Sequence, residues 1–307
     1  MKRFNDSTKS WRLVLATLIL SSPVAALSET VTLAAVADTS LFENAPNNNL
    51  GGVVFMPIGT TAVGTRCHGL VKFDLLENIP IGATIISASL DLRVTQGNGF
   101  RARDYSVYRM VSEWGEGTKS NGPNASGSIG AAATEGESSW NRRFAPSVAW
   151  GAVGGERGVD FADSPSATAS VGGVGNYQFT GPSMVADLQT WSNDPDSNFG
   201  WIIIVDQESD LGNARRFASR ESGSNPPRLT VEFESPLLID SATLDGDQVL
   251  IHFQAESGQS YILQRRPVVA SGTWTTITNI PSQGESGSFT VIDQVTPGSQ
   301  FYRLGRE

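Results

Sequence analysis

The sequence predicts an all-β protein, a jelly-roll β-sandwich with one short helix, followed by a smaller β-sandwich. Short apolar or alternating runs recur along the chain, and clusters of Gly, Asn, Pro and Ser separate them. This is the usual pattern of strands joined by turns. Helical spacing stands out in only one stretch, which follows Pro182.

The larger, N-terminal part is expected to hold strands at 31–37, 68–75, 84–94, 104–112, 201–206, 214–220 and 228–234. The period of two in the third of these runs puts five apolar residues on one face: Ile86, Ala88, Leu90, Leu92 and Val94. The stretch 115–175 is rich in Gly, Ala and Ser, and we expect long loops there with one or two short strands.

One helix is expected after the strands of the first half. Pro182 suits its first turn, and Asn193-Asp194-Pro195 ends it. Between these limits four apolar residues fall at helical spacing: Met184, Val185, Leu188 and Trp191.

A domain boundary is expected near Ser235-Pro236, so that residues 27–236 form the sandwich with the helix. Residues 237–307 are about the size of a small sandwich domain. With the runs YILQRR, GTWTTI, FTVID and QFYRL, they are similar to Ig- or fibronectin-like accessory domains of exported bacterial proteins. That resemblance implies a spacer or an attachment role. Its expected strands are 237–243, 248–255, 260–266, 274–280, 287–292 and 300–304.

Residues 1–26 have the features of a secretory signal peptide: a basic start, the apolar run 13–20 and a small-residue end near Ala26. The apolar run is short for a membrane span, so we expect a secreted protein without a membrane anchor. The whole chain carries −9 and this segment +3, which leaves −12 after cleavage. Such a charge disfavours nucleic acid as a partner.

Catalytic motifs are not evident, and we expect no enzyme. The chain has two histidines, His68 and His252, and one cysteine, Cys67. Neighbours on a strand point to opposite faces, so Cys67 and His68 are not placed as a nucleophile–base pair. Carboxylates are plentiful, however, and a glycosidase-type pair is defined by a separation in space that the sequence does not give.

No cofactor is required by these patterns, but a structural calcium ion could bind at one of two places. The segment 194–200 begins like a calcium loop, although Val205 stands where the bidentate glutamate belongs. The segment 37–52 offers Asp38, Asn48 and Asn49, in an asparagine-rich stretch that also suits plain turns.

Arginine and tryptophan supply the candidate ligand-binding residues. After residue 26 the chain has sixteen arginines and only two lysines. Arginine pairs bidentately with carboxylates and stacks on rings. Trp140, Arg142 and Arg143, with Trp150 nearby, would suit a sugar ring that bears a carboxylate. The tryptophans could equally close the edge of the core.

The run RCHGLVKFDLLENIPIGATIISASLDLRV at 66–94 resembles the opening of DNRLRE-domain proteins. SSWNRRF, SATASVGG, MVADLQTW with NFGWIII, and RRFASRE with PPRLTVEF follow in that family's order, so the resemblance covers about residues 31–235. The family overlaps carbohydrate-binding module family 96. The resemblance therefore implies a jelly-roll module that binds polysaccharides, several of them acidic. Such modules usually accompany a catalytic domain, and none is evident here.

The motif RRFASRE divides into two groups. Arg215 and Arg216 stand near a turn, and we expect them to bind ligand. Alternation along the strand predicts that Phe217 fills the core and that Glu221 points inward. A buried charge needs a partner, so Arg220 and Glu221 are expected to form structural ion pairs, in which Asp74 could take part.

These observations predict an exported, non-catalytic protein that binds an acidic or uronate-containing polysaccharide. Two alternatives remain at this stage: a structural or adhesive cell-surface protein, and a glycan-active enzyme with an unrecognised site.

Overall fold

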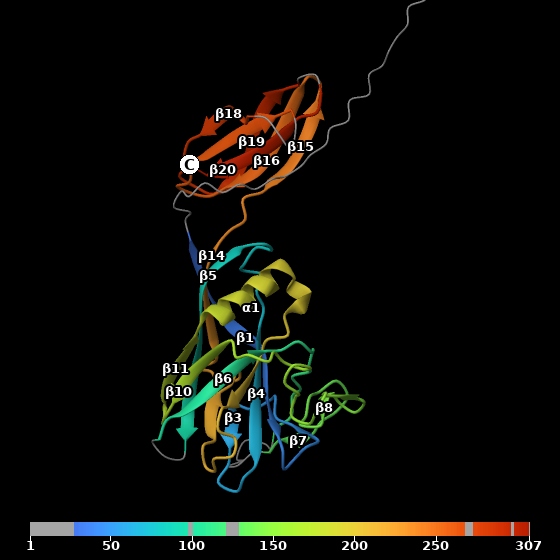
Figure 1. Cartoon of the computed structure of the whole chain (residues 1–307), viewed down its shortest axis with the longest axis vertical. Helices are drawn as coiled ribbons and strands as arrows, with labels where there is room; N and C mark the ends of the chain where they lie inside the picture. Colours follow the sequence, from blue (N-terminus) through green and yellow to red (C-terminus); the bar gives the residue numbers. More distant parts are fainter. Residues whose placement is uncertain (1–27, 98–100, 121–128, 268–272, 296–297, 307) are drawn as a thin grey trace, which may run out of the picture. The chain divides into compact units, whose positions relative to one another are not determined.

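A computed structural model describes residues 28–97, 101–120, 129–267, 273–295 and 298–306, and the expected signal peptide 1–26 lies outside them. The described chain divides into two compact units, Ser28–Ser235 and the part from Pro236 onward (Figure 1). Among the described residues, no helix has the length and apolar character needed to cross a membrane.

The first unit contains strands, one helix and one 3-10 turn. In chain order they are β1 (Glu29–Phe42), β2 (Asn48–Asn49), β3 (Phe55–Thr60), β4 (Arg66–Phe73), β5 (Thr84–Gly97), β6 (Arg103–Arg109), β7 (Ala131–Ala132), β8 (Arg142–Phe144), β9 (Val148–Ala149), β10 (Ala167–Val171), β11 (Gly175–Thr180), α1 (Pro182–Asn193), η1 (Pro195–Ser197), β12 (Trp201–Val205), β13 (Arg215–Ala218) and β14 (Arg228–Glu234). The expected all-β sandwich with one helix is confirmed.

Strand β1 joins the two layers of this sandwich. Its first half pairs with β14 as far as Ala34, and its second half pairs with β4 from Ala35 onward. A register shift beside the exposed Val36 turns the strand from one layer into the other. The main sheet therefore closes on itself like a barrel, in the order β1-β14-β5-β13-β3-β4-β12-β6-β10 with an additional β1–β4 pairing.

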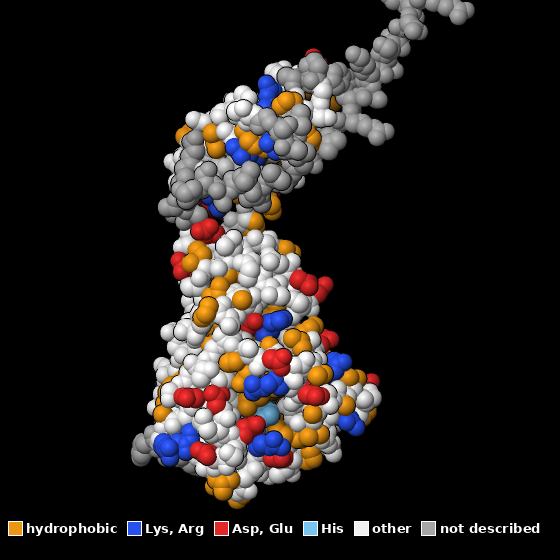
Figure 2. Space-filling view, viewed as in Figure 1, with side chains coloured by type: hydrophobic (Ala, Val, Ile, Leu, Met, Phe, Trp, Pro, Cys, Tyr) orange, Lys and Arg blue, Asp and Glu red, His pale blue; other side chains and the backbone are white. Residues whose placement is uncertain are grey.

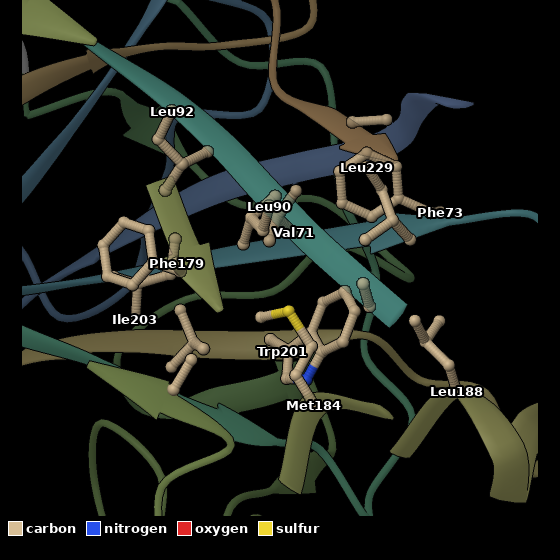
Figure 3. Close-up of a cluster of buried hydrophobic side chains, with 14 of the residues drawn as sticks. Val71, Phe73, Leu90, Leu92, Phe179, Met184, Leu188, Trp201, Ile203 and Leu229 are labelled. Carbon is tan, nitrogen blue, oxygen red and sulfur yellow. The ribbon is translucent and has the colours of Figure 1, made fainter. Parts of the chain in front are cut away.

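The main core lies between these layers. Figure 3 shows side chains from β4, β5, β11, β12 and β14 meeting there, with Met184 and Leu188 of α1. Trp201 and Trp191 pack edge to face with centroids 4.6 Å apart. Asp187 on the same helix accepts a hydrogen bond from the Trp201 indole at 2.8 Å and pairs with Arg109. The helix is thus held by both apolar and polar contacts.

The alternation predicted for β5 holds from Ala88 onward but slips before it. Ile85 is 6% exposed, whereas Ile86, expected inside, is 42% exposed. The cause is a bulge opposite β14, where Phe233 pairs with Ile85 while the preceding Glu232 pairs with Ser87. A bulge adds one residue and reverses the inward and outward faces beyond it.

A second apolar cluster covers the outer face of β4, β6 and β12. The chain between β6 and β10, residues 110–166, is called the excursion here, and residues 110–120 and 129–166 of it are described. It supplies four aromatic side chains to this cluster: Trp114, Trp140, Trp150 and Phe161. These rings pack on Leu41, Leu70, Ile202 and Ile204, which point away from the main core. The excursion therefore acts as a third layer.

The second unit has two three-stranded sheets around their own core. Its strands are β15 (Ile239–Asp245), β16 (Gln248–Ala255), β17 (Tyr261–Arg266), β18 (Thr275–Ile280), β19 (Gly287–Gln294) and β20 (Phe301–Arg306). One sheet runs β15-β16-β19 and the other β18-β17-β20. Phe253, Tyr261 and Tyr302 are among the residues buried between them.

The bulge in β5 gives a matched pair of substitutions. Ile85→Ala should lower the free energy of unfolding by about 2–5 kcal/mol, because it removes a buried side chain. Ile86→Ala should cost no more than about 1 kcal/mol, because that side chain is solvent-exposed. Urea unfolding followed by tryptophan fluorescence measures this, since five of the six described tryptophans lie in the first unit. Equal losses for the two variants would contradict the bulge.

Candidate ligand-binding pocket

A pocket of about 300 Å³ opens in the first unit beside the β3–β4 hairpin. Its volume is at the lower end of the range that small ligands occupy in proteins. The walls are mainly apolar, with a few polar groups, and the lining residues include Phe42, Asn44, Pro57, Val63, Gln96 and Arg216. Val63 is 86% exposed, so the hairpin carries an apolar side chain to the mouth of the pocket.

Arg215 and Arg216 both line this pocket, and Arg216 is the more exposed of the two. Its guanidinium lies 4.3 Å from the ring centroid of Phe55 on β3, and Nη1 donates a hydrogen bond to Gln96 Oε1 on β5 at 2.9 Å. The side chain is half-buried, and among the described residues no carboxylate pairs with it. A guanidinium held by a ring and an amide keeps its remaining N–H groups for a ligand.

Arg215 has a different role from the one expected of it. Only 3% of its surface is exposed. Its donors are used by four backbone carbonyl oxygens, those of Arg101, Gly172, Asn213 and Ala214, at 2.7–3.1 Å. Arg215 lines the pocket too, but most of its five N–H donors already satisfy buried carbonyl groups, so it has much less hydrogen-bonding capacity for a ligand than Arg216.

Trp140 does not present a face to a sugar, because it is 2% exposed. Its ring packs against His68 at a centroid distance of 4.8 Å, and Arg66 lies over it at 5.3 Å. Trp150 is equally internal and donates its indole N–H to Ser139 O. The alternative role, closing the edge of the core, is the one the packing supports.

Arg142 and Arg143 lie on β8 in the excursion and do not line the pocket. Arg142 donates to the carbonyl oxygens of Pro146 and Asn141, and Arg143 donates to that of Glu113. Both are half-buried, so parts of their guanidiniums stay accessible. Both lie outside the pocket.

Arg220 is the centre of an ionic cluster. It makes a two-pronged ion pair with Glu116 of the excursion and a 3.1 Å ion pair with Glu221. Its backbone N–H donates to Asp38 Oδ2 of β1 at 2.6 Å, and the backbone N–H of Asp38 donates to Glu116. Asp74, which the sequence suggested as a partner in these ion pairs, is not part of the cluster. It is exposed and accepts a hydrogen bond from Leu76 N.

Three carboxylates thus share one arginine. Burial raises the pKa of Asp38 to about 8. The hydrogen bond from Arg220 N opposes this shift, and the nearby Glu221 and Glu116 add to it. Burial also raises the pKa of Glu221 above its usual value. At neutral pH Asp38 therefore holds a proton, which removes one of the three negative charges that surround Arg220.

The two histidines and the cysteine have structural surroundings. His68 is 5% exposed, and its ring nitrogens face Gly154 O at 2.8 Å and Glu208 Oε1 at 2.7 Å. Burial alone would raise the pKa of Glu208, but the hydrogen bond with His68 brings it below its usual value. Burial raises the pKa of Cys67 to about 12, which keeps this thiol protonated. His252 lies in the second unit and contacts Thr290 Oγ1.

The residues proposed for calcium are engaged with the protein itself. Asn49 donates to the carbonyl oxygens of Glu116 and Ser138, and its own Oδ1 accepts from Gly51 N and Lys119 N. Asn48 donates to Ile129 O. Within the described ranges, no three His, Cys, Asp or Glu side chains are grouped so that they could hold a metal ion. Segment 195–197 forms the 3-10 turn η1.

Three partners in these sites were not singled out from the sequence: Phe55, Gln96 and Glu116. Phe55 and Gln96 flank Arg216 only because β3 and β5 both pair with β13. The sole local signal was the aromatic residue in FMPIGT, in a run whose Pro57 and Gly59 argue against a strand.

No family model matches this chain, and a search of curated proteins finds no similar sequence.

The ionic cluster predicts a pH-dependent difference between the protein and an Asp38→Asn variant. An aspartate whose pKa is higher in the folded state than in the unfolded state stabilises the fold less as pH rises between the two values. The stability of Asp38→Asn relative to the parent should therefore increase from about pH 4 to pH 8 and then level off. Urea unfolding at several pH values measures the difference.

Asp104→Asn is the matched control, since it removes an exposed carboxylate from β6. Its difference from the parent should change little over the same range. An Asp38→Asn difference that is equally flat would contradict a protonated Asp38 in the cluster.

Proposed function

We propose that this chain is an exported, non-catalytic polysaccharide-binding protein, and that its pocket takes a uronate residue of an acidic glycan. The observation that carries this proposal is the geometry of Arg216. Its guanidinium is stacked on Phe55, anchored on Gln96 and without an acidic partner among the described residues. That is a preorganised receptor for a carboxylate.

The walls of the pocket suit the rest of the sugar. Pro57 and Val63 offer apolar surface for the C–H face of a pyranose ring, and Asn44 offers an amide for its hydroxyl groups. The carboxylate of a uronate would lie on the open edge of Arg216. Neutral sugars could use the apolar walls but would leave the guanidinium without a counter-charge.

The resemblance to DNRLRE-domain proteins and to carbohydrate-binding module family 96 supports the same proposal. Its motifs fall on the strands and on the helix that build the first unit: β4 ends at the phenylalanine of FDL, MVADLQTW forms most of α1, and RRFASRE begins with β13. We infer membership of that family from the order of these motifs. Secretion is part of the proposal and follows from the character of residues 1–26.

Arg216→Gln tests the proposal. The substitution removes the charge and the fork while keeping a side chain that can bond Gln96. It should weaken binding to polygalacturonate or alginate about tenfold or more, because a charge-assisted bidentate pair is lost. Affinity electrophoresis of residues 27–307 in gels that contain the polymer measures this. The thermal unfolding midpoint should stay near that of the parent, because Arg216 is not part of the core.

Two variants serve as controls. Arg228→Gln removes the same charge from an exposed position on β14 and should leave binding unchanged. Arg220→Ala should lower the unfolding midpoint, because it leaves Glu116 and Glu221 without their cation. Failure of every acidic polymer to retard the parent chain would overturn the proposal and favour the structural or adhesive role. Release of unsaturated or reducing ends would favour an enzyme.

A further inference from the structure

The second unit contains an arginine whose surroundings resemble those of Arg216. Its four basic residues are all arginines, and all lie on the adjacent strands β17 and β20: Arg265, Arg266, Arg303 and Arg306. Arg265 pairs with Asp293 at 2.7 Å, and Arg306 pairs with Glu256 at 2.8 Å. Figure 2 shows basic side chains beside apolar ones on one face of this unit.

Arg303 is different from these two. Its guanidinium lies 4.5 Å from the ring centroid of Trp274, and its Nε donates to Gln264 Oε1 at 2.7 Å. Gln264 is its direct partner across the β17–β20 ladder. The side chain is half-buried, and no carboxylate in the described part of the chain pairs with it.

Nearby charge strengthens the preference for an anion. Arg266 lies 4.3 Å from the same indole ring, so Trp274 contacts two guanidiniums. Burial and repulsion from Arg266 lower the pKa of Arg303 below its usual value. An incoming carboxylate would relieve that repulsion.

The two units therefore share one arrangement. In each, an arginine stacks on an aromatic ring at 4.3–4.5 Å and is anchored by the amide oxygen of a glutamine from the neighbouring strand. Neither arginine forms an ion pair with a carboxylate of the described residues. The stacked ring also gives a flat apolar surface beside the cation, which suits a sugar ring next to a carboxylate.

We propose that Gln264, Trp274 and Arg303 form a second carboxylate-binding site, so that the second unit also binds acidic polysaccharide. This inference rests on the proposed function, because it assigns the same class of ligand to another site. Two weak sites on one chain bind a polymer more tightly than either alone. The accessory domain is then a binding element and not only a spacer.

The test measures apparent affinity for polygalacturonate by affinity electrophoresis of residues 27–307, with dextran as a neutral polymer and oligo(dT) as a nucleic acid. Arg303→Gln should weaken binding about tenfold or more, and it should remove the binding that remains in Arg216→Gln. Arg303→Lys keeps the charge but loses the fork, and should bind more weakly than the parent. Arg228→Gln controls for the change in charge.

The outcomes distinguish failure of the second site from failure of the proposed function. If Arg216→Gln weakens binding while Arg303→Gln equals the parent in both backgrounds, the second site is overturned and the proposed function stands. If the parent chain is not retarded, both fail. Full binding by Arg303→Lys would overturn recognition through the guanidinium fork. An effect of Arg303→Gln on dextran, or stronger binding to oligo(dT) than to polygalacturonate, would overturn the assigned ligand class. Thermal melting confirms that each variant is folded.

Discussion

The first unit depends on a buried arginine that has no ionic partner. Arg215 donates to four backbone carbonyl oxygens from three separate segments, and so joins β13 to the loops around Arg101 and Gly172. Unpaired carbonyl groups in the interior would cost about 1–3 kcal/mol each. Because neighbouring strand residues point to opposite sides, burying Arg215 sends Arg216 outward to Phe55 and Gln96. The structural arginine thereby positions the one that we propose binds ligand.

Ion pairs and hydrogen bonds hold the segment that follows β13. Asp38, Glu116 and Glu221 come from β1, from the excursion and from the turn after β13, and Arg220 links all three. Raising the pKa of one acid is less costly than burying three negative charges beside one positive charge. With Asn49 bonded to Glu116 O and Ser138 O, this cluster holds the aromatic excursion against the sandwich.

Most of the strands follow from alternation in the sequence, and the helix follows from its spacing. The sequence does not predict the positions of strands β3, β10 and β11, because Pro57, Gly59 and short polar runs carry little strand pattern. The bulge at Ile86 depends on pairing with β14, which no local signal reveals. Gln96 and Arg216 lie 120 residues apart, so their contact follows from topology alone. The proposal keeps arginine as the ligand-binding residue type, but only the structure shows that Arg215 and Trp140 are buried while Arg216 is half-buried.

The most direct test of this account is a crystal structure of the chain with a trigalacturonate bound. The account predicts a ligand carboxylate within hydrogen-bonding distance of the Arg216 guanidinium, with the sugar ring against Pro57 and Val63, while Arg215 keeps its four carbonyl partners. A ligand held instead by Arg142 and Arg143 of the excursion, with the pocket empty, would contradict the account.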